Sequence, residues 1–429
     1  MSDIGRREFL SGLAAAPAAL AQRGANDRIG IAMVGVGTRG HFLLQQIQQV
    51  PNTEVRILCD LYEGNLSRAR KLTTNPNARI VMDWEKAVTD KDIDAVIIAT
   101  PDFWHAPQTI RAAEAKKDIY VEKGWCRTLA EAKAMRKAVK DNKVVMQLGH
   151  NYNSLPVLHK AREIYQSGAL GKLPLVRTYI DRTGVEPEWQ FYGAYDVKQP
   201  PKDASEGSID WKRFIANATP REFDVQRFFT WRRWWEYGSG IAGDLMSHLW
   251  DSVNGVLGMG IPETAVTQGG NYFWKDGRDV PDMWHVLFDY PSKELAITFG
   301  CSFHNRHQGE LAQYLGREKT MEMNPGFLRT YIAEWKQEYY DRLGAARRAA
   351  VKAGKSPEDA AVDPDYVFKK GELEVSTHWQ NFVDCIRTRE TPRCGVDRAF
   401  EEAVAIVMSI EAYKQKRQVR WDAAREEVV

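Results

Sequence analysis

A glycine-rich turn near the start of the chain limits the possible folds more than any other feature. The apolar run 29–34 leads directly into Gly35-Val36-Gly37-Thr38-Arg39-Gly40, and a helical pattern continues to residue 49. In such a strand–turn–helix unit, the first glycine allows a tight turn, the second lets a diphosphate approach the backbone, and the third lets the helix pack on the strand. The diphosphate then binds N–H groups at the start of the helix. The turn therefore predicts a dinucleotide site formed by Gly35, Gly37, Thr38, Arg39 and Gly40.

The pattern of the next hundred residues extends this unit into a domain. Further apolar runs at 55–59, 80–82, 95–99, 119–121 and 144–148 alternate with helical patterns at 65–72, 105–115 and 129–139. Continuous apolar strands separated by helices are typical of a parallel sheet that is covered on both faces. We therefore expect a doubly wound Rossmann domain over residues 25–149.

Asp60 indicates which dinucleotide the domain binds. It ends the second apolar run, about 20 residues beyond the glycine turn, where a carboxylate can accept both hydroxyls of the adenosine ribose. The next residues, Leu61 and Tyr62, offer no cation for a 2′-phosphate. The sequence therefore predicts NAD rather than NADP as the cofactor.

The pattern changes beyond residue 151. An amphipathic helix at 157–167 precedes long stretches rich in aromatic residues and glycine, with strands expected at 173–179, 285–289, 295–301 and 319–323 and helices at 243–257, 331–353, 376–387 and 398–415. This order fits one large, mostly antiparallel sheet with helices on one face. We expect a substrate-binding α/β domain over residues 150–429, so that the whole chain belongs to the α/β class.

Three motifs point to a family. They are Ala-Thr-Pro-Asp-Phe-Trp-His at 99–105, Tyr-Val-Glu-Lys at 120–123 followed by Thr-Leu-Ala-Glu at 128–131, and Gly-Ile-Ala-Gly-Asp-Leu-Met-Ser-His-Leu-Trp-Asp at 240–251. Together they resemble the glucose-fructose oxidoreductase, inositol dehydrogenase and MocA (Gfo/Idh/MocA) family, with a weaker likeness over 325–375. The resemblance implies an oxidoreductase in which Thr100, Pro101, Glu122 and Lys123 contact the cofactor. His105 either contacts the nicotinamide side or caps its helix.

One residue departs from the family pattern. The proline that follows the family's lysine is replaced here by Gly124. Proline fixes its own φ and restricts the residue before it, so it helps to orient the lysine, whereas glycine does neither. The departure bears on the position of Lys123 and on the outcome of the reaction.

The expected catalytic residues are Lys123, Asp244 and His248. Lys123 falls at the carboxyl end of a parallel strand, where ligands bind in such sheets, and its ammonium can stabilise an alkoxide. Asp244 and His248 stand four residues apart and share one helical face. His248 is the natural proton acceptor because its ordinary pKa is about 6.5, and Asp244 orients it or binds a neighbouring hydroxyl. The structural alternative is that Asp244 caps the helix and His248 packs in the core.

Aromatic and polar side chains near these residues predict a carbohydrate or polyol substrate. Trp235 and Tyr237 precede the catalytic helix, and aromatic rings suit the C–H faces of a sugar. Arg232 can bind an anionic substituent. His150 and Tyr152 follow the last Rossmann strand, where the two domains meet, and are expected to touch the substrate.

Composition and the N-terminus restrict partners and location. A net charge of +2 without a dense basic stripe predicts no nucleic-acid partner, and the five cysteines show no metal-binding spacing, so we expect no metal. Arg6-Arg7 precede a short apolar run at 13–21, which predicts a twin-arginine signal over residues 1–24, with a mature protein outside the cytoplasm and not in a membrane. We expect a homo-oligomer, a dimer or a tetramer.

Three classes of function are compatible with these features. The first is net oxidation of a secondary hydroxyl of a sugar, glycoside or inositol, with the hydride passing to tightly bound NAD. The second is a redox-neutral glycosidase or lyase in which the hydride is borrowed and returned. The third is a non-catalytic sensor of NAD or sugar, which would not need Lys123, Asp244 and His248 together.

Overall fold

The structure is a computed structural model that describes residues 28–190 and 199–429. The expected signal over residues 1–24 therefore lies outside the described residues. Within them, no helix combines the length and the apolar character that crossing a membrane requires.

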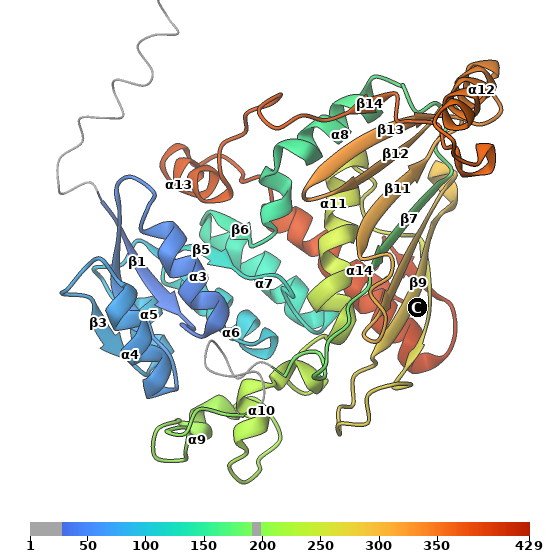
Figure 1. Cartoon of the computed structure of the whole chain (residues 1–429). Coiled ribbons are helices and arrows are strands. Elements are labelled where there is room, and N and C mark those ends of the chain that lie inside the picture. Colours follow the sequence, from blue (N-terminus) through green and yellow to red (C-terminus); the bar gives the residue numbers. More distant parts are fainter. Residues whose placement is uncertain (1–27, 191–198) are drawn as a thin grey trace, which may run out of the picture.

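The N-terminal part is a six-stranded parallel sheet in the order β3-β2-β1-β4-β5-β6 (Figure 1). Its strands are β1 (Ile29–Val34), β2 (Thr53–Cys59), β3 (Arg79–Val81), β4 (Ala95–Ile98), β5 (Asp118–Val121) and β6 (Met146–Leu148). Its helices are α3 (Thr38–Ile47), α4 (Glu63–Leu72), α5 (Trp84–Thr89), α6 (Asp102–Glu114) and α7 (Leu129–Asn142). The order reverses between β1 and β4, which creates the switch point where doubly wound sheets bind ligands. The predicted Rossmann fold is confirmed.

The C-terminal part is a ten-stranded sheet in the order β14-β13-β12-β11-β7-β10-β9-β8-β15-β16. Its strands are β7 (Leu175–Ile180), β8 (Thr264–Gly270), β9 (Met283–Tyr290), β10 (Leu295–Ser302), β11 (Glu310–Leu315), β12 (Lys319–Asn324), β13 (Phe327–Ile332), β14 (Tyr366–Val367), β15 (Val419–Asp422) and β16 (Glu427–Val428). Only β7 and β10 pair in parallel among the described pairs, so the predicted, mostly antiparallel sheet is confirmed.

Helices cover one face of this larger sheet. Alternate residues of β9 and β10 are buried, as expected for a sheet with one covered face. The covering helices are α8 (Pro156–Gln166), α11 (Ser247–Leu257) and α14 (Val396–Gln415), and Figure 1 shows them between the two sheets. Helix α13 (His378–Thr388) returns to the Rossmann sheet, where Trp379 stacks on Tyr120 with ring centroids 4.2 Å apart.

One predicted element is wrong in part. The helix expected over 331–353 begins only at Gln337, as α12 (Gln337–Lys352), because residues up to Ile332 form β13. Every second residue of β13 is buried and the strand pairs with β12, so tertiary pairing overrides the local helical pattern.

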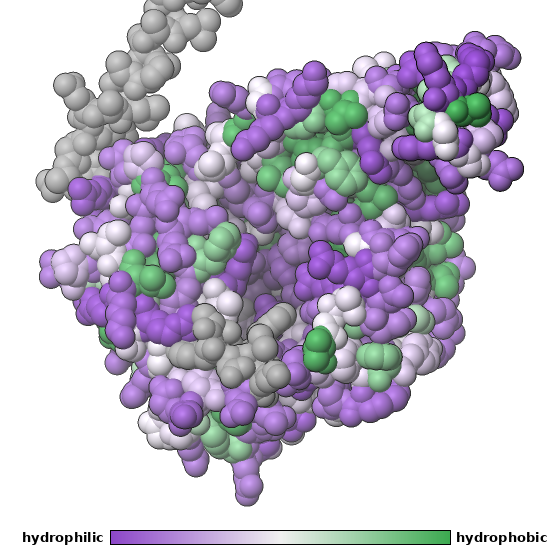
Figure 2. All heavy atoms as spheres, viewed as in Figure 1, coloured by the Kyte–Doolittle hydropathy of each residue, from purple (hydrophilic) through white to green (hydrophobic). Residues whose placement is uncertain are grey.

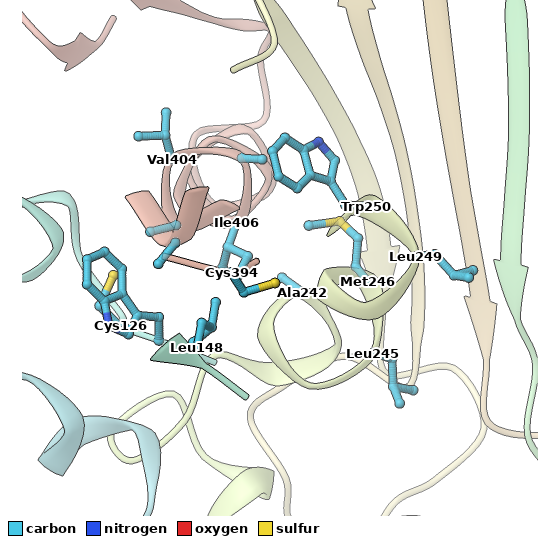
Figure 3. Close-up of a cluster of buried hydrophobic side chains, with 14 of the residues drawn as sticks. Cys126, Leu148, Ala242, Leu245, Met246, Leu249, Trp250, Cys394, Val404 and Ile406 are labelled. Atoms are coloured by element: carbon cyan, nitrogen blue, oxygen red, sulfur yellow. The ribbon is translucent and has the colours of Figure 1, made fainter. Parts of the chain in front are cut away.

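A buried apolar cluster fixes the helix that carries the expected catalytic residues. Figure 3 shows Ala242, Met246 and Trp250 of that helix facing Leu148 at the end of β6 and Cys394 before α14. Leu245 and Leu249 belong to the same cluster but lie on another side of the helix, and Leu245 also lines the cleft described below. The helix is thus held from behind by both parts of the molecule, and its other side is available to a ligand.

Candidate active site

A cleft of about 750 Å³ runs along the carboxyl ends of the Rossmann strands. The residues that follow β1, β2, β4 and β5 line one side of it, and residues of the C-terminal part line the other. Figure 2 shows a hollow between the two halves of the molecule. Its position is the one that ligands take in open α/β sheets.

The glycine turn has the geometry that a diphosphate needs. Gly35 has a φ of +85°, and a Cβ there would lie 2.7 Å from the carbonyl of Ala99. A Cβ on Gly40 would lie 2.1 Å from the carbonyl oxygen of Gly35, so close packing of α3 on β1 requires glycine. A Cβ on Gly37 would have only the Asn65 side chain nearby, at 3.6 Å. No side chain among the described residues caps the start of α3, so its N–H groups can bind an anion.

Asp60 braces this turn and also lines the cleft. Its carboxylate accepts hydrogen bonds from the backbone N–H of Val36 at 2.8 Å and of Tyr62 at 3.0 Å. Burial raises the pKa of Asp60, and these hydrogen bonds partly oppose that shift. The Asn65 amide also donates to this carboxylate at 3.3 Å, so of about four acceptor positions on it one remains for a ribose hydroxyl. The glycine turn and Asp60 together fit NAD.

Lys123 and Asp244 form the charged centre of the cleft. The Lys123 ammonium donates to Asp244 Oδ1 at 2.5 Å and to the Asp244 backbone oxygen at 2.7 Å. Arg232 Nε donates to the same Oδ1 at 3.1 Å, and Trp189 Nε1 donates to Oδ2 at 2.7 Å. Burial alone would raise the pKa of Asp244, but the charges of Lys123 and Arg232 hold it well below its usual range. The carboxylate is therefore an anion that positions Lys123.

His248 lies at the cleft with its ring between two others. Tyr152 stacks on it with centroids 5.0 Å apart, and His150 meets it edge-on at 5.4 Å. Nδ1 of His248 is buried and has no hydrogen-bond partner among the described residues. Burial, followed by the charges of Lys123 and His150, holds the pKa of His248 well below its ordinary value. The imidazole is therefore neutral and can accept a proton.

A π-helical turn explains why Asp244 and His248 do not pair. Residues Ala242–Met246 form a π-helix ahead of α11, which begins at Ser247. Hydrogen bonds to the fifth residue widen the turn, so positions four apart no longer lie directly above one another. Asp244 therefore turns toward Lys123 while His248 turns toward Tyr152. The expectation that Asp244 orients His248 is not supported by any contact among the described residues.

Gly124 is required by its surroundings. Its φ is +72°, a value that proline cannot adopt, and a Cβ there would lie 2.9 Å from the Asp102 carboxylate oxygens. Asp102 in turn accepts from the Ser239 hydroxyl at 2.5 Å. His105 Nδ1 lies 3.0 Å from the Gly124 oxygen, and its Nε2 lies 2.8 Å from the Thr100 oxygen. His105 is buried and ties the loop of Lys123 to the loop after β4. Among the described residues, no side chain caps the start of α6, so the expected cap is wrong, and the expected contact with the nicotinamide side stays a prediction.

The remaining predicted residues divide into two groups. Thr38, Arg39, Thr100, Pro101, Glu122, Tyr152 and Arg232 line the cleft. Arg39 Nε and Glu122 Oε1 form an ion pair at 2.9 Å, which fixes the cleft residue next to Lys123. His150, Trp235 and Tyr237 are not among the cleft residues, so the structure does not bring them to the site, and their expected contact with the substrate stays a prediction.

Packing explains these three exceptions. Tyr237 is fully buried against Phe103, and Trp235 packs near Trp284. His150 is fully buried behind His248. An aromatic ring near a site in sequence is often needed for the core, and the sequence alone does not show which rings are.

Other cleft residues were missed. Arg182 lines the cleft, and Trp189 Nε1 donates to Asp244. Arg182 follows β7 closely, so a charged residue just beyond a predicted strand was an available signal.

Comparison with known proteins agrees with this geometry. Residues 29–150 match the Gfo/Idh/MocA family, described as an oxidoreductase family with an NAD-binding Rossmann fold. The N-terminal part of the chain is thus similar to the NAD-binding domain of that family.

Two curated relatives show what this chain is similar to. It is 31% identical to levoglucosan dehydrogenase of Pseudarthrobacter phenanthrenivorans over 199 residues, which cover 44% of this chain and 42% of that protein. It is 30% identical to glycosyl hydrolase family 109 protein 1 of Bacteroides fragilis over 178 residues, which cover 39% of this chain and 37% of that protein. The matched segments thus span less than half of either relative.

A solved structure extends the likeness of the fold. Levoglucosan dehydrogenase in complex with NADH and levoglucosan superposes with a TM-score of 0.63 over 92% of this chain and 99% of that one, at 17% identity. At this identity the comparison supports the fold, including the large second sheet.

Proposed function

We propose that the protein oxidises a secondary hydroxyl of a sugar, glycoside or polyol, with the hydride passing to tightly bound NAD. The observation that carries the proposal is that a cationic donor, Lys123, and a neutral acceptor, His248, line the same cleft as the glycine turn. The similarity to levoglucosan dehydrogenase supports a carbohydrate or polyol substrate.

Each residue has a separate task in this reaction. The Lys123 ammonium, fixed by Asp244, donates a hydrogen bond to the reacting hydroxyl and stabilises the negative charge that develops on its oxygen. His248 accepts the hydroxyl proton as a neutral base. Bound NAD supplies the hydride acceptor. Arg232, which shares the Asp244 carboxylate, reaches the cleft beside Lys123 and can contact a further hydroxyl or an anionic group of the substrate.

A panel of compounds tests the proposal. The purified protein is mixed with neutral sugars, methyl glycosides, uronates and inositols, and absorbance at the NADH band is followed together with the mass of the product. A keto product from at least one class supports the proposal. Binding of NAD without turnover of any class would favour the sensor instead.

A redox-neutral glycosidase or lyase is a second candidate function, and a segment that lies over the dinucleotide site favours it. We call residues 203–232, which include α9 (Trp211–Phe214) and α10 (Val225–Phe229), the strap. Figure 1 shows α9 and α10 below the Rossmann domain. The strap bonds to the residues just after Asp60, through Asp210 N–H to the Leu61 oxygen at 2.8 Å and the Tyr62 hydroxyl to Asp203 at 2.7 Å.

The strap also lines the same cleft as the glycine turn. Phe214, Phe228 and Phe229 are cleft residues, and the Phe229 ring meets the Tyr62 ring edge-on at 5.4 Å. These aromatic side chains would slow the release of a bound dinucleotide, which supports tight binding of NAD. Retained NAD suits a cycle in which it is returned to its oxidised form at each turnover.

The redox-neutral cycle begins with the same oxidation. The C3 hydroxyl of a glycoside becomes a ketone, which acidifies the C2–H, and loss of that proton expels the group at C1. Water then adds at C1 with return of a proton to C2, and the hydride returns to C3, so the net change is hydrolysis. The similarity to a glycosyl hydrolase family 109 protein supports this candidate. Deuterium at C2 of the product after reaction in D₂O distinguishes it from net oxidation.

We also propose that the protein is exported. The support is the Arg6-Arg7 pair ahead of a short apolar run. Twin-arginine export carries folded proteins, which would allow NAD to be loaded before export.

A further inference from the structure

A buried charged pair that the mechanism above does not use lies directly behind His248. His150 follows β6 and Glu402 belongs to α14, and both side chains are 0% exposed. Nε2 of His150 and Oε2 of Glu402 are 2.6 Å apart, in a contact that is bent rather than linear. Charged side chains are rarely buried completely, because the loss of hydration must be offset by a partner. The pair is therefore a costly feature for which the fold alone gives no reason.

The geometry connects this pair to the expected base. The His150 ring meets the His248 ring at a centroid distance of 5.4 Å and an angle of 82°. Tyr152 stacks on His248 at 5.0 Å with an angle of 27°. Two rings thus fix His248, and one of them, that of His150, contacts the Glu402 carboxyl group.

The other charged groups around the pair form a second ion pair. Asp251 of α11 accepts from Arg398 Nε at 2.7 Å, and the Arg398 guanidinium also donates to the Asp251 backbone oxygen at 2.6 Å. The further titratable groups that interact with His150 or Glu402 are Lys123, His248, His378, Cys126 and Cys394. Asp251 is thus paired with Arg398, and Glu402 contacts His150.

A metal site is the competing interpretation of these side chains. Ligand atoms of His150, Asp251 and Glu402 all lie within 4.8 Å of one another. However, the Arg398 guanidinium already supplies the cation at Asp251, and the Asn153 amide donates to the same carboxylate. The arrangement is that of an ion-pair network, which needs no further cation.

We propose that His150 and Glu402 are positioning residues for His248: Glu402 keeps a proton on His150, and the resulting imidazolium keeps His248 neutral and oriented as the proton acceptor. The proposal rests on the proposed function in which His248 is the base. It extends the catalytic centre to α14, which contributes no residue to the cleft.

The pKa shifts of the two histidines are consistent with this arrangement, and the charge of His150 opposes the rise that burial causes in the pKa of Glu402. Burial alone lowers the pKa of His150, but the carboxylates of Glu402 and Asp251 outweigh it and raise that pKa above the ordinary value. The charge on His150 contributes to lowering the pKa of His248. Activity that requires neutral His248 therefore persists at a pH below the ordinary histidine pKa.

The pH profile of the Glu402→Gln variant tests the proposal. Without the carboxylate, buried His150 loses its proton, so the pKa of His248 rises and the acid limb of the kcat profile moves to higher pH. A unit charge at this distance predicts a shift of about one to two pH units. KM and the affinity for NAD should be unchanged, because neither residue lines the cleft.

Three variants serve as controls. Glu401→Gln makes the same change one residue away, where the carboxylate accepts from Asn254 at 2.8 Å, and should leave the profile unmoved. His150→Gln should reproduce the upward shift, and the double variant with Glu402→Gln should shift no further. Lower turnover with an unmoved acid limb would show that the pair only supports the fold.

Nitrogen NMR of histidine in the wild-type protein keeps the proposal testable if the variants fail to fold. The expected result is a buried imidazolium for His150 and a neutral ring for His248 at the same pH. Neutral His150 would overturn the proposal, and so would stoichiometric Zn²⁺ binding that Glu402→Gln abolishes. The NMR result does not depend on turnover, so it is separate from failure of the proposed function.

Discussion

At the scale of single residues, the site separates the stabilisation of charge from the transfer of a proton. The Asp244 carboxylate accepts hydrogen bonds from Lys123 and Arg232, while the His248 ring packs against the rings of His150 and Tyr152. The motif alone predicted these residues but grouped Asp244 with His248, because the π-turn that separates them has no recognised sequence pattern. The residues of the centre were thus predictable, and their pairing was not.

Removing either group should abolish turnover and leave the cofactor bound. Lys123→Met removes the stabilising charge and His248→Ala removes the base, and loss of a positioned acid or base typically costs about 100- to 10,000-fold in kcat. NAD content should stay near the wild-type value, because the glycine turn and Asp60 are unchanged, whereas Lys123→Met should lower the melting temperature because Asp244 loses its ammonium partner. Lys117→Met is the matched control, since Lys117 precedes the same strand at its opposite end and bonds to the Ile93 oxygen. A fully active Lys123→Met protein would mean that another group stabilises the charge.

Gly124 should be sensitive to a single methyl group. Gly124→Ala combines a φ of +72° with a Cβ 2.9 Å from the Asp102 carboxylate, so it should lower both stability and kcat. Gly168→Ala is the control, because Gly168 has a φ of +76° and no neighbour within 4 Å. The control should lose about 1–2 kcal/mol of stability and no activity. Equal effects of the two changes on kcat would show that the loop does not position Lys123.

At the scale of elements, the strands of the Rossmann sheet were predictable because each is a continuous apolar run. The second sheet was predicted less completely. Its strands alternate buried and more exposed residues, and β8 ends in two glycines, so these strands lack the continuous apolar runs that mark a strand in the sequence. The last two residues of β13 were taken for the start of a helix, because only the pairing with β12 shows that they are extended.

The strap should control the release of the cofactor. Phe228→Ala and Phe229→Ala remove rings that line the cleft and contact Tyr62, so NAD should leave about three- to tenfold faster. Release is measured by dilution into excess NAD-free buffer with a trap for the free nucleotide. Phe223→Ala is the control, since Phe223 packs on Trp211 outside the cleft. An unchanged release rate in the two cleft variants would show that the strap does not retain NAD.

At the scale of the whole molecule, the two sheets and their helices enclose one cleft, and the helix of His248 is held between them (Figures 1 and 3). Sequence reasoning predicted this arrangement because the glycine turn, Lys123 and the helix of His248 all carry motifs. It placed Arg232 at the site but did not predict that α9 and α10 fold over Tyr62, because the residues of these two helices match no motif.

Export is a property of the entire chain and is tested on it. Replacing Arg6 and Arg7 by lysine should keep the protein in the cytoplasm, folded and with NAD bound, because the twin-arginine route depends on the pair. Cell fractionation with immunodetection measures the outcome, and the mature protein should begin near Gln22. Export of the lysine variant at the normal level would point to a different route.

The transfer of hydrogen from substrate to cofactor tests the central claim most directly. The loaded protein is mixed with glycosides and inositols that carry deuterium on the carbons bearing hydroxyl groups, quenched at successive times, and the released nucleotide is weighed by mass spectrometry. The account predicts a nicotinamide one mass unit heavier than ordinary NADH, which accumulates in net oxidation and is transient in the redox-neutral cycle. Product formation during which deuterium never enters the nucleotide would contradict it.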